Sequence, residues 1–489
     1  MDLQKSYRNI NYQNLVEKYT KCTNAELFAD INPGDLDHVL AKVPYYSIEC
    51  ADAALERAVQ AFDKWSKTSP VKRGQILLKA GEIIEAEVED FALLLTLEEG
   101  KTLNDSRAEV YRAAGLFKFY GALAFKLGGK TLPSADEDTR IYTVKEPLGA
   151  VLAITPWNFP ISIPAWKIAP ALAAGNTVVL KPAEKTPLIA LKLLDALRRA
   201  GLPEGALEVV PGRGNVVGEH LVRSESIMAV SFTGSTEVGR HIYKTLGEKK
   251  TMNRIQLELG GKNAIYVDKT ADIGKAIEIV TRSAFGLTGQ SCTATSRLIV
   301  HADIYDQFMK AFIDRVKSWT VGPGWTPVDM GPVVDKEQYD KDLYYIELGK
   351  KEGAKLVYGG NPLNIGKGYY LEPTIFEGVT KDMRIFQEEI FGPVLAVTKA
   401  ADLDEAIELT NAVEYGHTAG IITRDLRAAR EFSARVVAGV IKINKPTIGL
   451  ELQAPFGGFK ASGATTWKEM GEEALEFYTK EKTIYEGLI

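Results

Sequence analysis

The sequence predicts an α/β fold with two parallel-sheet domains, and three observations predict it. Residues 51–126 carry apolar side chains at three- and four-residue spacing, which is typical of amphipathic helices. Between about 149 and 268, short apolar runs alternate with helical stretches, which indicates β-α-β units and a sheet buried on both faces. A second alternation after residue 292 indicates a second α/β domain.

Each region supplies its own elements. The first contains the helical stretches AALERAVQAFDKW, GQILLKAGEIIEAEVEDFALLLTLEEG and AEVYRAAGLFKFYGALAFKL. In the second, the runs GAVLAI, NTVVL, LEVV, IMAVSF and NAIYV predict strands, and PLIALKLLDALRRAGL predicts a helix. In the third, SRLIVH, PVLAV, TAGIIT and GVIKIN predict strands, with helices at YDQFMKAFIDRVKSW and LDEAIELTNA.

Two further segments have strand-like patterns without a core of their own. Residues 127–147 are polar, contain Gly and Pro, and end in an alternating run, and the C-terminal TKEKTIYEG is similar. Isolated hairpins are marginally stable alone, and exposed edge strands permit pairing with another chain.

Size and composition limit the function classes. A chain of 489 residues is too long for one ordinary core and suggests two or three domains. Its formal net charge of −5 gives no electrostatic case for nucleic-acid binding. The N-terminus has no signal-peptide pattern and no stretch approaches about 18 uninterrupted apolar residues, so we expect a cytoplasmic protein without a membrane partner.

The cysteines are few and odd in number. Cys22, Cys50 and Cys292 argue against a disulfide framework and for a reducing compartment. We expect Cys22 and Cys50 to be inert and buried. Cys292 has small polar neighbours where a core site would have branched aliphatic ones, which favours a reactive thiol. The five histidines lack ligand spacing, so no metal site is predicted.

Cys292 and Glu258 lie 34 residues apart and suit the two halves of an acyl transfer. A thiolate that attacks an aldehyde gives a thiohemiacetal, and hydride loss leaves a thioester that a carboxylate-activated water hydrolyses. The alternative for Glu258 is a solvated strand residue. Its neighbours Leu257, Leu259 and Gly260 are a poor setting for a solvated charge, and burial would raise its pKa toward a useful range.

These two segments, LELGGKN around Glu258 and GQSCTATSR around Cys292, resemble the signatures of the aldehyde dehydrogenase superfamily. Further motifs are similar to the family in sequence: ITPWNFP, KPAEKTP, FTGST, EIFGP and PFGG. The resemblance implies two Rossmann-like domains and a small protruding sheet. It implies a dinucleotide-binding domain at 1–126 and 148–259, a catalytic domain at 260–465, and oligomerisation segments at 127–147 and 466–489. A homo-oligomer, a dimer or tetramer, is implied.

The resemblance also implies a nicotinamide dinucleotide. The strand that ends in FTGST leads to a helix N-terminus, which suits a pyrophosphate near Ser235. Lys181 and Glu184 match residues that reach the adenosine ribose, and a carboxylate there favours NAD over NADP. There are alternatives for these two residues. Glu184 could rotate away, Lys181 could pair with a phosphate, or both could lie in a solvated loop without a ligand. The expected cofactor residues are Thr155, Trp157, Lys181, Glu184, Gly214, Phe232, Gly234, Ser235, Leu259, Glu389 and Phe391.

The remaining catalytic assignments also come from the resemblance. Asn158 and the backbone amide of Cys292 match the donors for the oxyanion. An asparagine between two prolines is otherwise a turn residue. Lys167 matches a position near the site, with a positioning or electrostatic role. Acylating relatives lack the glutamate that Glu258 matches, so hydrolysis to a free acid is favoured.

The substrate is the least determined part. Arg112 lies on an apolar helical stripe, where a guanidinium needs an anionic partner, and the substrate could supply it. The alternatives are an ion pair with Glu109 or a side chain that extends to solvent. The tail and cysteine motifs look most like dehydrogenases of 2,5-dioxopentanoate. Dehydrogenases of glyceraldehyde or succinate semialdehyde, or a non-catalytic binding or structural protein on this fold, are the alternatives. The expected substrate residues are Arg112, Phe159, Trp166, Ser291, Thr293 and Phe456.

Overall fold

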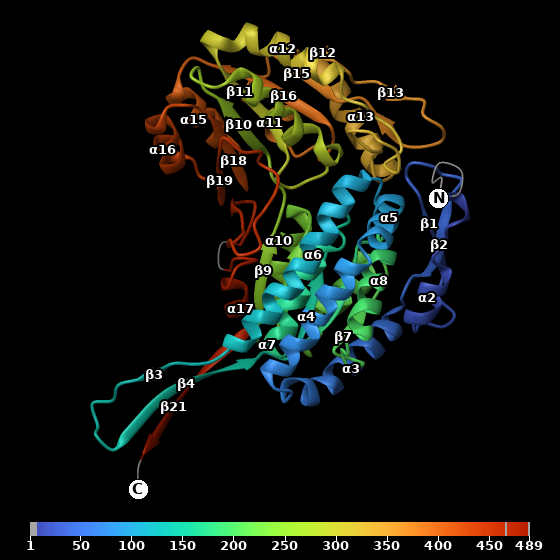
Figure 1. Cartoon of the computed structure of the whole chain (residues 1–489), viewed down its shortest axis with the longest axis vertical. Helices are drawn as coiled ribbons and strands as arrows, with labels where there is room; N and C mark the ends of the chain where they lie inside the picture. Colours follow the sequence, from blue (N-terminus) through green and yellow to red (C-terminus); the bar gives the residue numbers. More distant parts are fainter. Residues whose placement is uncertain (1–6, 465–466, 488–489) are drawn as a thin grey trace.

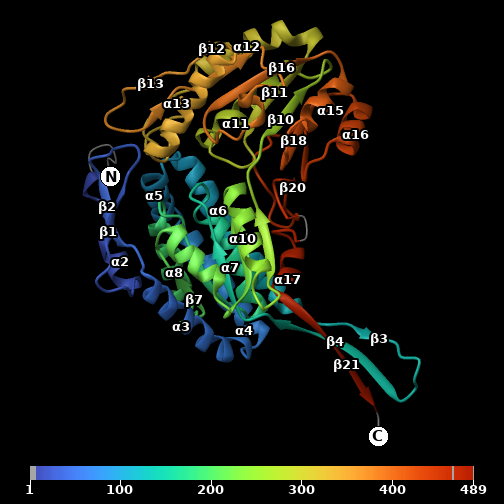
Figure 2. The ribbon, with the colours of Figure 1, turned by 180° about the vertical axis from the view of Figure 1, so that it is seen from behind.

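The computed structural model describes residues 7–464 and 467–487. Figure 1 shows two α/β units stacked along the long axis, with a thin arm of strands that extends from the lower unit. Figure 2 shows the same arrangement from behind, with the C-terminus at the end of the arm. Within the described residues, no helix is both long and apolar enough to cross a membrane.

The lower unit contains a five-stranded parallel sheet in the order β7-β6-β5-β8-β9. Four of its strands are the predicted apolar runs, and they are buried because helices cover both faces. The strands are β5 (Ala150–Ile154), β6 (Thr177–Lys181), β7 (Leu207–Val209), β8 (Ile227–Thr233) and β9 (Arg254–Glu258).

The predicted helical region before this sheet is confirmed. It contains α3 (Ile48–Ser66), α4 (Pro70–Ala86), α5 (Val88–Glu99) and α6 (Leu103–Leu123). The helices between the strands are α7 (Ser162–Ala174), α8 (Pro187–Arg199), α9 (Glu219–Arg223) and α10 (Thr236–Gly247). All residues of α7 are buried, because the helix lies in the main apolar core of this unit.

Two buried carboxylates fix the starts of helices in this unit. Glu98 accepts hydrogen bonds from the backbone amides of Leu188 and Ile189 at the start of α8. Glu109 accepts a hydrogen bond from the backbone amide of Ser162, the first residue of α7. The first amides of a helix have no partner within the helix, and their positive end favours an anion.

The upper unit contains a seven-stranded sheet in the order β12-β15-β16-β11-β10-β18-β19. Among the described strand pairs of this sheet, only β12–β15 is antiparallel. The strands are β10 (Asn263–Val267), β11 (Thr295–His301), β12 (Lys355–Tyr358), β15 (Thr374–Glu377), β16 (Val394–Ala400), β18 (Thr418–Ile422) and β19 (Val440–Ile443). The run NAIYV, placed in the first alternation by the sequence pattern, is β10 of this second sheet, because the chain crosses between units after β9.

Helices cover both faces of the upper sheet. They are α11 (Ile273–Phe285), α12 (Tyr305–Lys317), α13 (Lys336–Lys351), α14 (Arg384–Gln387), α15 (Leu403–Asn411) and α16 (Leu426–Arg435). Successive residues of β10 alternate between two apolar cores, with Ile265 and Val267 in one and Ala264 and Tyr266 in the other. This alternation explains the continuous apolar run.

The N-terminal region differs from prediction. Helix α2 (Gln13–Tyr19) is followed by an antiparallel pair, β1 (Leu27–Ile31) and β2 (Val39–Pro44), that the pattern did not predict. The expectation for Cys22 and Cys50 was wrong, because the two form a disulfide and both are half-buried. Residues 28 positions apart meet with Cα atoms 5.5 Å apart. Sequence spacing does not reveal such proximity, and the argument for a reducing compartment is thereby lost.

The arm is an antiparallel sheet of β3 (Thr131–Leu132), β4 (Thr139–Pro147) and β21 (Thr479–Gly487). Helix α17 (Glu473–Phe477) leads into β21. The two predicted strand-like segments therefore pair with each other, although residues 466 and 488–489 lie outside the described residues. The arm's role in oligomerisation stays a prediction.

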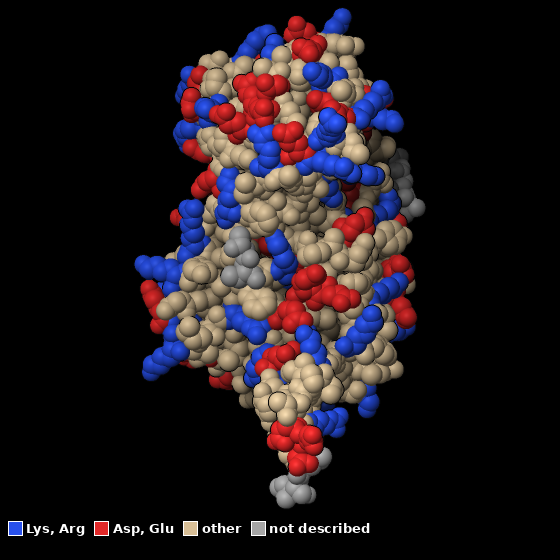
Figure 3. All heavy atoms as spheres, turned by 90° about the vertical axis from the view of Figure 1, so that its left-hand side faces the viewer, with Lys and Arg blue, Asp and Glu red and all other residues tan. Residues whose placement is uncertain are grey.

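Charges of both signs are mixed over the face shown in Figure 3. Basic and acidic side chains are intermixed over the upper unit in this view. Ion pairs of this unit include Arg435–Asp404 and Arg384–Glu388. This distribution agrees with the small net charge of −5.

Replacing Cys22 by serine is expected to lower the free energy of unfolding. In the chain-entropy account, a closed loop of this length stabilises the fold by about 3 to 4 kcal/mol. Thermal midpoints of the wild type and the variant, each with and without reductant, measure the effect. In denaturant without reductant, thiol titration of the wild type should detect Cys292 alone. Detection of three thiols would contradict the disulfide.

Candidate active site

The predicted catalytic and cofactor residues gather where the two units meet, at the carboxyl ends of the lower sheet. Thr155 and Asn158 follow β5, Lys181 ends β6 and Glu258 ends β9, whereas Cys292 comes from the upper unit just before β11. Parallel sheets bind ligands at this edge. A cavity of about 170 Å³ lies there, and Asn158 and Cys292 are among its lining residues.

The loop that carries Cys292 has a strained backbone. Leu287 and Thr288 each have a φ of 58°, and Gly289 has a φ of 68°. Side chains other than glycine rarely occupy this left-handed region, and strained residues are common at functional sites. A Cβ atom on Gly289 would lie 2.3 Å from the carbonyl oxygen of Gly392, so glycine is required there.

Asn263 fixes this loop from the other side. Its Nδ2 donates to the carbonyl oxygens of Cys292, at 2.7 Å, and Ala294, at 2.9 Å. Its Oδ1 accepts from the amide of Thr418 at 2.9 Å, which anchors the side chain to the upper sheet. The position of the thiol is therefore determined by buried hydrogen bonds.

Asn158 is held in the cavity wall by two contacts. Its Nδ2 donates to the carbonyl oxygen of Gln290 at 3.0 Å, which leaves the second N–H of the amide for another acceptor. The backbone carbonyl oxygen of Asn158 accepts from Nζ of Lys101 at 2.6 Å. An amide donor fixed beside a nucleophile suits a developing oxyanion.

Lys101 and Glu109 form a buried ion pair that supports Asn158. The two charged atoms are 2.7 Å apart, and both side chains are at most 2% exposed. The second oxygen of Glu109 accepts from the amides of Ile161 and Ser162, each at 3.1 Å. The sequence interpretation missed this pair, although a Lys after Gly100 between two apolar helices was an available signal.

Glu258 is 2% exposed and lies close enough to Cys292 for its charge to act on the thiol. Its Oε2 accepts from the amide of Gly458 at 3.1 Å. A Cβ atom on Gly457 would lie 2.7 Å from Oε1, so this glycine makes room for the carboxylate. Burial and the nearby Glu469 raise the pKa of Glu258 well above its usual value. A carboxylate of that kind is suited to general base catalysis near neutral pH.

Lys167 forms a second buried ion pair, with Glu469. Its Nζ also donates to Oγ of Ser231 at 2.9 Å, and Ser231 donates to Oε1 of Gln256 at 2.8 Å. Two of the three N–H donors of Lys167 are used by these buried partners, which agrees with a positioning role. The second oxygen of Glu469 has no hydrogen-bond partner among the described residues.

The environment of Cys292 disfavours its thiolate. Burial raises the pKa of the thiol, and the carboxylates of Glu258, Glu389 and Glu469 raise it further. The reactive form therefore needs a base or a bound cation nearby. Of the three carboxylates, Glu258 has the largest effect on the pKa of Cys292.

The nicotinamide end of the expected cofactor site fits the cavity beside Cys292. Glu389 accepts from the amide of Gly261 at 2.7 Å, and Phe391 lies edge-on to Trp157 with ring centroids 5.4 Å apart. A Cβ atom on Gly260 would lie 2.7 Å from Oε2 of Glu389. The lining of this cavity also includes Thr233, Gly234, Ser235 and Leu259.

Gln338 and Lys341 also line this cavity, and the sequence interpretation missed them. Both lie on α13, which was not among the predicted helices. Gln338 donates to Oδ1 of Asp342 at 2.7 Å and to the carbonyl oxygen of Ile390 at 2.9 Å. Their only signal was a polar helical stretch far along the chain from the cysteine.

The adenosine end fits a second cavity of about 490 Å³ between β8, α10 and the turn before α9. Lys181, Gly214 and Phe232 line it. Glu184 accepts from the amide of Gly214 at 2.8 Å, so its carboxylate is held at the cavity edge. Ser235 caps α10 by accepting from the amide of Val238 at 3.3 Å.

The predicted aromatic walls lie together but do not line the cavity beside Cys292. Trp166 and Phe456 have ring centroids 5.8 Å apart, and both pack in the same apolar core with Phe159. Trp166 Nε1 is buried without a hydrogen-bond partner among the described residues. Ser291 and Thr293 are hydrogen-bonded to each other at 3.0 Å, on either side of the cysteine.

Arg112 does not line the cavity of Cys292. The predicted alternative of a pair with Glu109 is not formed, because Glu109 is bound to Lys101. Burial lowers the pKa of Arg112, while Glu109 and Glu451 oppose that effect. A Cβ atom on Gly115, one turn farther along α6, would lie 2.8 Å from Leu452, so the segment that leads to Phe456 crosses the helix here.

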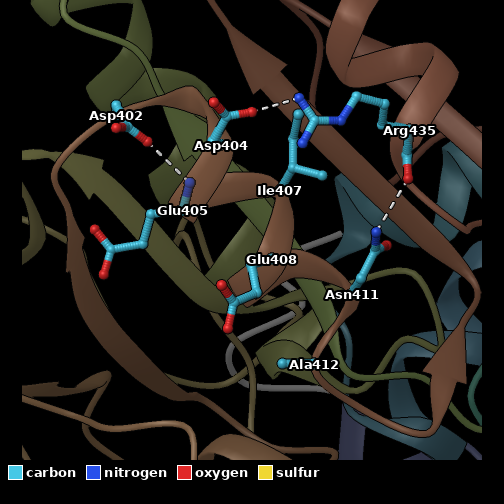
Figure 4. A pocket seen from close by; sticks show the side chains of 8 residues that line it. All are labelled: Asp402, Asp404, Glu405, Ile407, Glu408, Asn411, Ala412 and Arg435. Carbon is cyan, nitrogen blue, oxygen red and sulfur yellow. Dashed lines mark hydrogen bonds and ion pairs between the residues drawn. The ribbon is translucent and has the colours of Figure 1, made fainter.

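A larger hollow, of about 1020 Å³, lies elsewhere, on the surface beside α15 and α16 (Figure 4). Several of its polar groups already have partners: Arg435 pairs with Asp404, and Asn411 donates to the backbone carbonyl oxygen of Arg435. Asp402 accepts from the amide of Glu405 at the start of α15. No buried polar group converges on this hollow, so we do not regard it as the site.

The comparisons with known proteins agree with this geometry. The sequence matches the aldehyde dehydrogenase family over residues 19–484. A 2,5-dioxopentanoate dehydrogenase of Saccharolobus solfataricus is 66% identical, over 98% of this chain and 99% of its own length. An alpha-ketoglutarate semialdehyde dehydrogenase of Haloferax volcanii is 45% identical, over 93% of this chain and 95% of its own.

Solved structures have the same fold. The P. syringae indole-3-acetaldehyde dehydrogenase in complex with NAD+ and IAA has a TM-score of 0.95 at 36% identity, and the match covers 100% of this chain and 99% of that one. A further indole-3-acetaldehyde dehydrogenase with NAD+ has a TM-score of 0.92 at 37% identity, over 96% and 95% of the two chains. The predicted fold class is confirmed.

Changing Glu258 to glutamine is expected to slow hydrolysis of a Cys292 thioester by about 100-fold or more, the range for a general base. Acylation of the cysteine should persist, because the thiol itself is unchanged. The base acts as the carboxylate, so wild-type hydrolysis should rise with pH through the raised pKa of Glu258, and the variant should lose this limb. Rapid-quench measurement of burst and steady state from pH 5 to 9 tests this. Simultaneous loss of burst and turnover in a folded variant would contradict it.

Proposed function

Because the chain belongs to the aldehyde dehydrogenase family, we propose that it oxidises a semialdehyde with a distal carboxylate, 2,5-dioxopentanoate, to the free acid. Family membership makes it an NAD(P)-dependent aldehyde dehydrogenase. The observation that supports the hydrolytic mechanism is the convergence of Cys292, Asn158 and Glu258 around one buried site. The substrate is suggested by the two relatives whose names give it.

In the first half of the reaction, Sγ of Cys292 bonds to the aldehyde carbon, and its proton leaves to a base. The free N–H of Asn158 and the amide of Cys292 stabilise the resulting oxyanion. A nicotinamide held by Glu389 and Phe391 would supply the acceptor for the hydride that the former aldehyde carbon loses. The product on the enzyme is a thioester of Cys292.

In the second half, Glu258 takes a proton from a water whose oxygen bonds to the thioester carbon. The carbon–sulfur bond then breaks, which releases the acid and restores Cys292. Lys167 balances the charge of Glu469, so that one fewer unpaired carboxylate lies beside Glu258. In this proposal Lys167 positions the site and does not exchange a proton with substrate.

The proposed dinucleotide site extends over both cavities. Glu389 and Phe391 would hold the nicotinamide half, Ser235 and the start of α10 the phosphates, and Lys181 the adenosine ribose. The lower unit, 1–126 and 148–259, would be the dinucleotide-binding domain and 260–465 the catalytic domain. The segments 127–147 and 466–489 would join subunits in a dimer or tetramer.

Arg112 is the proposed reader of the substrate's carboxylate. Among the described residues, no carboxylate lies within 4.0 Å of its guanidinium, although the side chain is half-buried. Lys442 lies nearby, with its Nζ bound to the carbonyl oxygen of Gly449 at 2.8 Å. A half-buried guanidinium with unused donors favours an anionic ligand.

The function is tested with a steady-state panel of 2,5-dioxopentanoate, succinate semialdehyde, glyceraldehyde and an uncharged aldehyde of similar length. We expect the highest kcat/KM for 2,5-dioxopentanoate, with the free acid as product. A preference for the uncharged aldehyde would exclude the proposed substrate class, and absence of oxidation of all four would exclude the proposed function.

Arg112→Met is expected to raise KM for 2,5-dioxopentanoate by roughly 10- to 150-fold, which corresponds to about 1.5 to 3 kcal/mol for hydrogen bonds to a charged group. KM for the uncharged aldehyde should change little, since methionine keeps most of the apolar stem. The same panel measures both. Equal losses on the two substrates would assign Arg112 to structure.

Glu184→Thr is expected to raise the ratio of kcat/KM with NADP to that with NAD, because a carboxylate repels a 2′-phosphate. Threonine keeps a hydroxyl for the ribose and removes the charge. Kinetics with both dinucleotides at fixed aldehyde give the ratio. An unchanged ratio would mean that another residue selects the cofactor.

A further inference from the structure

His417 lies against the carboxylate of Glu258. The residue is placed between β17 (Tyr415–Gly416) and β18, and it is 1% exposed. Its Nδ1 is 3.8 Å from Oε2 of Glu258, and its ring lies 5.1 Å from that of Phe456, centroid to centroid. The sequence pattern assigned no role to this histidine.

Neither ring nitrogen of His417 has a hydrogen-bond partner among the described residues. Buried polar atoms without partners are rare and costly. The 3.8 Å separation exceeds a hydrogen bond by less than 1 Å. Oε2 of Glu258 receives one hydrogen bond, from Gly458, and a carboxylate oxygen can accept a second. A small rotation of either side chain therefore forms a bond that satisfies both groups.

The other surroundings of His417 keep the imidazole neutral. Burial and the charge of Lys468 lower the pKa of His417 to about 4. Lys262 and Arg297 line the same small cavity as the histidine, and Nζ of Lys262 has no partner among the described residues. A neutral imidazole has one N–H donor and one acceptor.

The surroundings of His417 differ from those of Glu258. The cavity of about 10 Å³ has room for about one water, a suitable donor to the imidazole acceptor. Glu258 instead faces carboxylates and cations from other elements, namely Glu469, Lys167 and Lys468. His417 is thus the neutral donor that directly faces the general base.

We propose that His417 is a positioning residue for Glu258, whose Nδ1–H donates to Oε2 and holds the carboxylate ready to activate water. This inference rests on the proposed function, because it acts in thioester hydrolysis. The donated hydrogen bond favours the carboxylate over the carboxylic acid. It thereby opposes the effect of burial and keeps the base available at lower pH.

The test compares His417→Leu, which removes the donor, with His417→Asn, whose amide keeps a donor near the position of Nδ1. p-Nitrophenyl acetate acylates the cysteine without a dinucleotide, so its burst reports acylation and its steady state reports hydrolysis. Aldehyde oxidation with NAD gives the corresponding pair of rates. Thr418→Val is the matched control, since Oγ1 of Thr418 lines the same cavity and has no hydrogen-bond partner among the described residues.

With His417→Leu we expect an unchanged burst, hydrolysis about tenfold slower at pH 7, and the acidic limb of hydrolysis shifted upward by about one pH unit. His417→Asn should stay within about threefold of the wild type. In a Glu258→Gln background, His417→Leu should have no further effect, because it acts through Glu258. His417→Met replaces the leucine variant if circular dichroism shows that variant to be unfolded.

Superimposable pH profiles of the wild type and His417→Leu would overturn the inference. So would a tenfold loss that persists in the Glu258→Gln background, or an equal shift with Thr418→Val. A wild type without an acylation burst, or a Glu258→Gln variant with normal hydrolysis, would overturn the proposed function as well, and the inference with it.

Discussion

The ion pair between Lys101 and Glu109 connects helix α6, the start of α7 and the wall of the active site. Glu109 accepts from the first amides of α7, and Lys101 binds the carbonyl oxygen of Asn158 at 2.6 Å. A buried pair of this kind adds little net stability against an apolar pair, but removal of one partner leaves an uncompensated charge. The pair therefore contributes geometric definition, because only one arrangement of α6, α7 and the asparagine loop satisfies every donor and acceptor.

The same principle recurs at the thiol. Several buried carboxylates surround Cys292, and Lys167 is paired with one of them, Glu469. Within the described residues Glu258 forms no ion pair with a lysine or arginine, and its Oε2 accepts from the amide of Gly458. A general base needs a high proton affinity and access to water. A lysine bound directly to Glu258 would lower the pKa of Glu258 and so its proton affinity. The neighbouring ion pair of Lys167 with Glu469 instead offsets negative charge near Glu258 without contacting it.

Sequence patterns predicted the parts of the fold that depend on local periodicity, and motifs predicted the parts of the site that chemistry constrains. The helices of 51–126 and the apolar strands were predicted because buried surfaces repeat every two or 3.6 residues. Cys22 and Cys50 were misinterpreted, since their approach depends on how a loop folds back onto α3. No local pattern predicts the places of Gln338 and Lys341 beside Cys292, or of His417 beside Glu258, because tertiary contacts alone bring them there. The domain limits and the roles of the site residues stay predictions.

The arm joins segments that are far apart in sequence, since β21 pairs with β4 over residues 479–487 and 139–147. Proteins are made from the N-terminus, at about 5 to 20 residues per second, so about 330 residues separate the synthesis of these strands by roughly 20 to 70 s. During that interval β4 has an unpaired edge, which is a site of unwanted association between nascent chains. Glu469, the partner of Lys167, is made almost as late. Shortened chains released from the ribosome would therefore lack both the completed arm and the full electrostatic arrangement around the thiol.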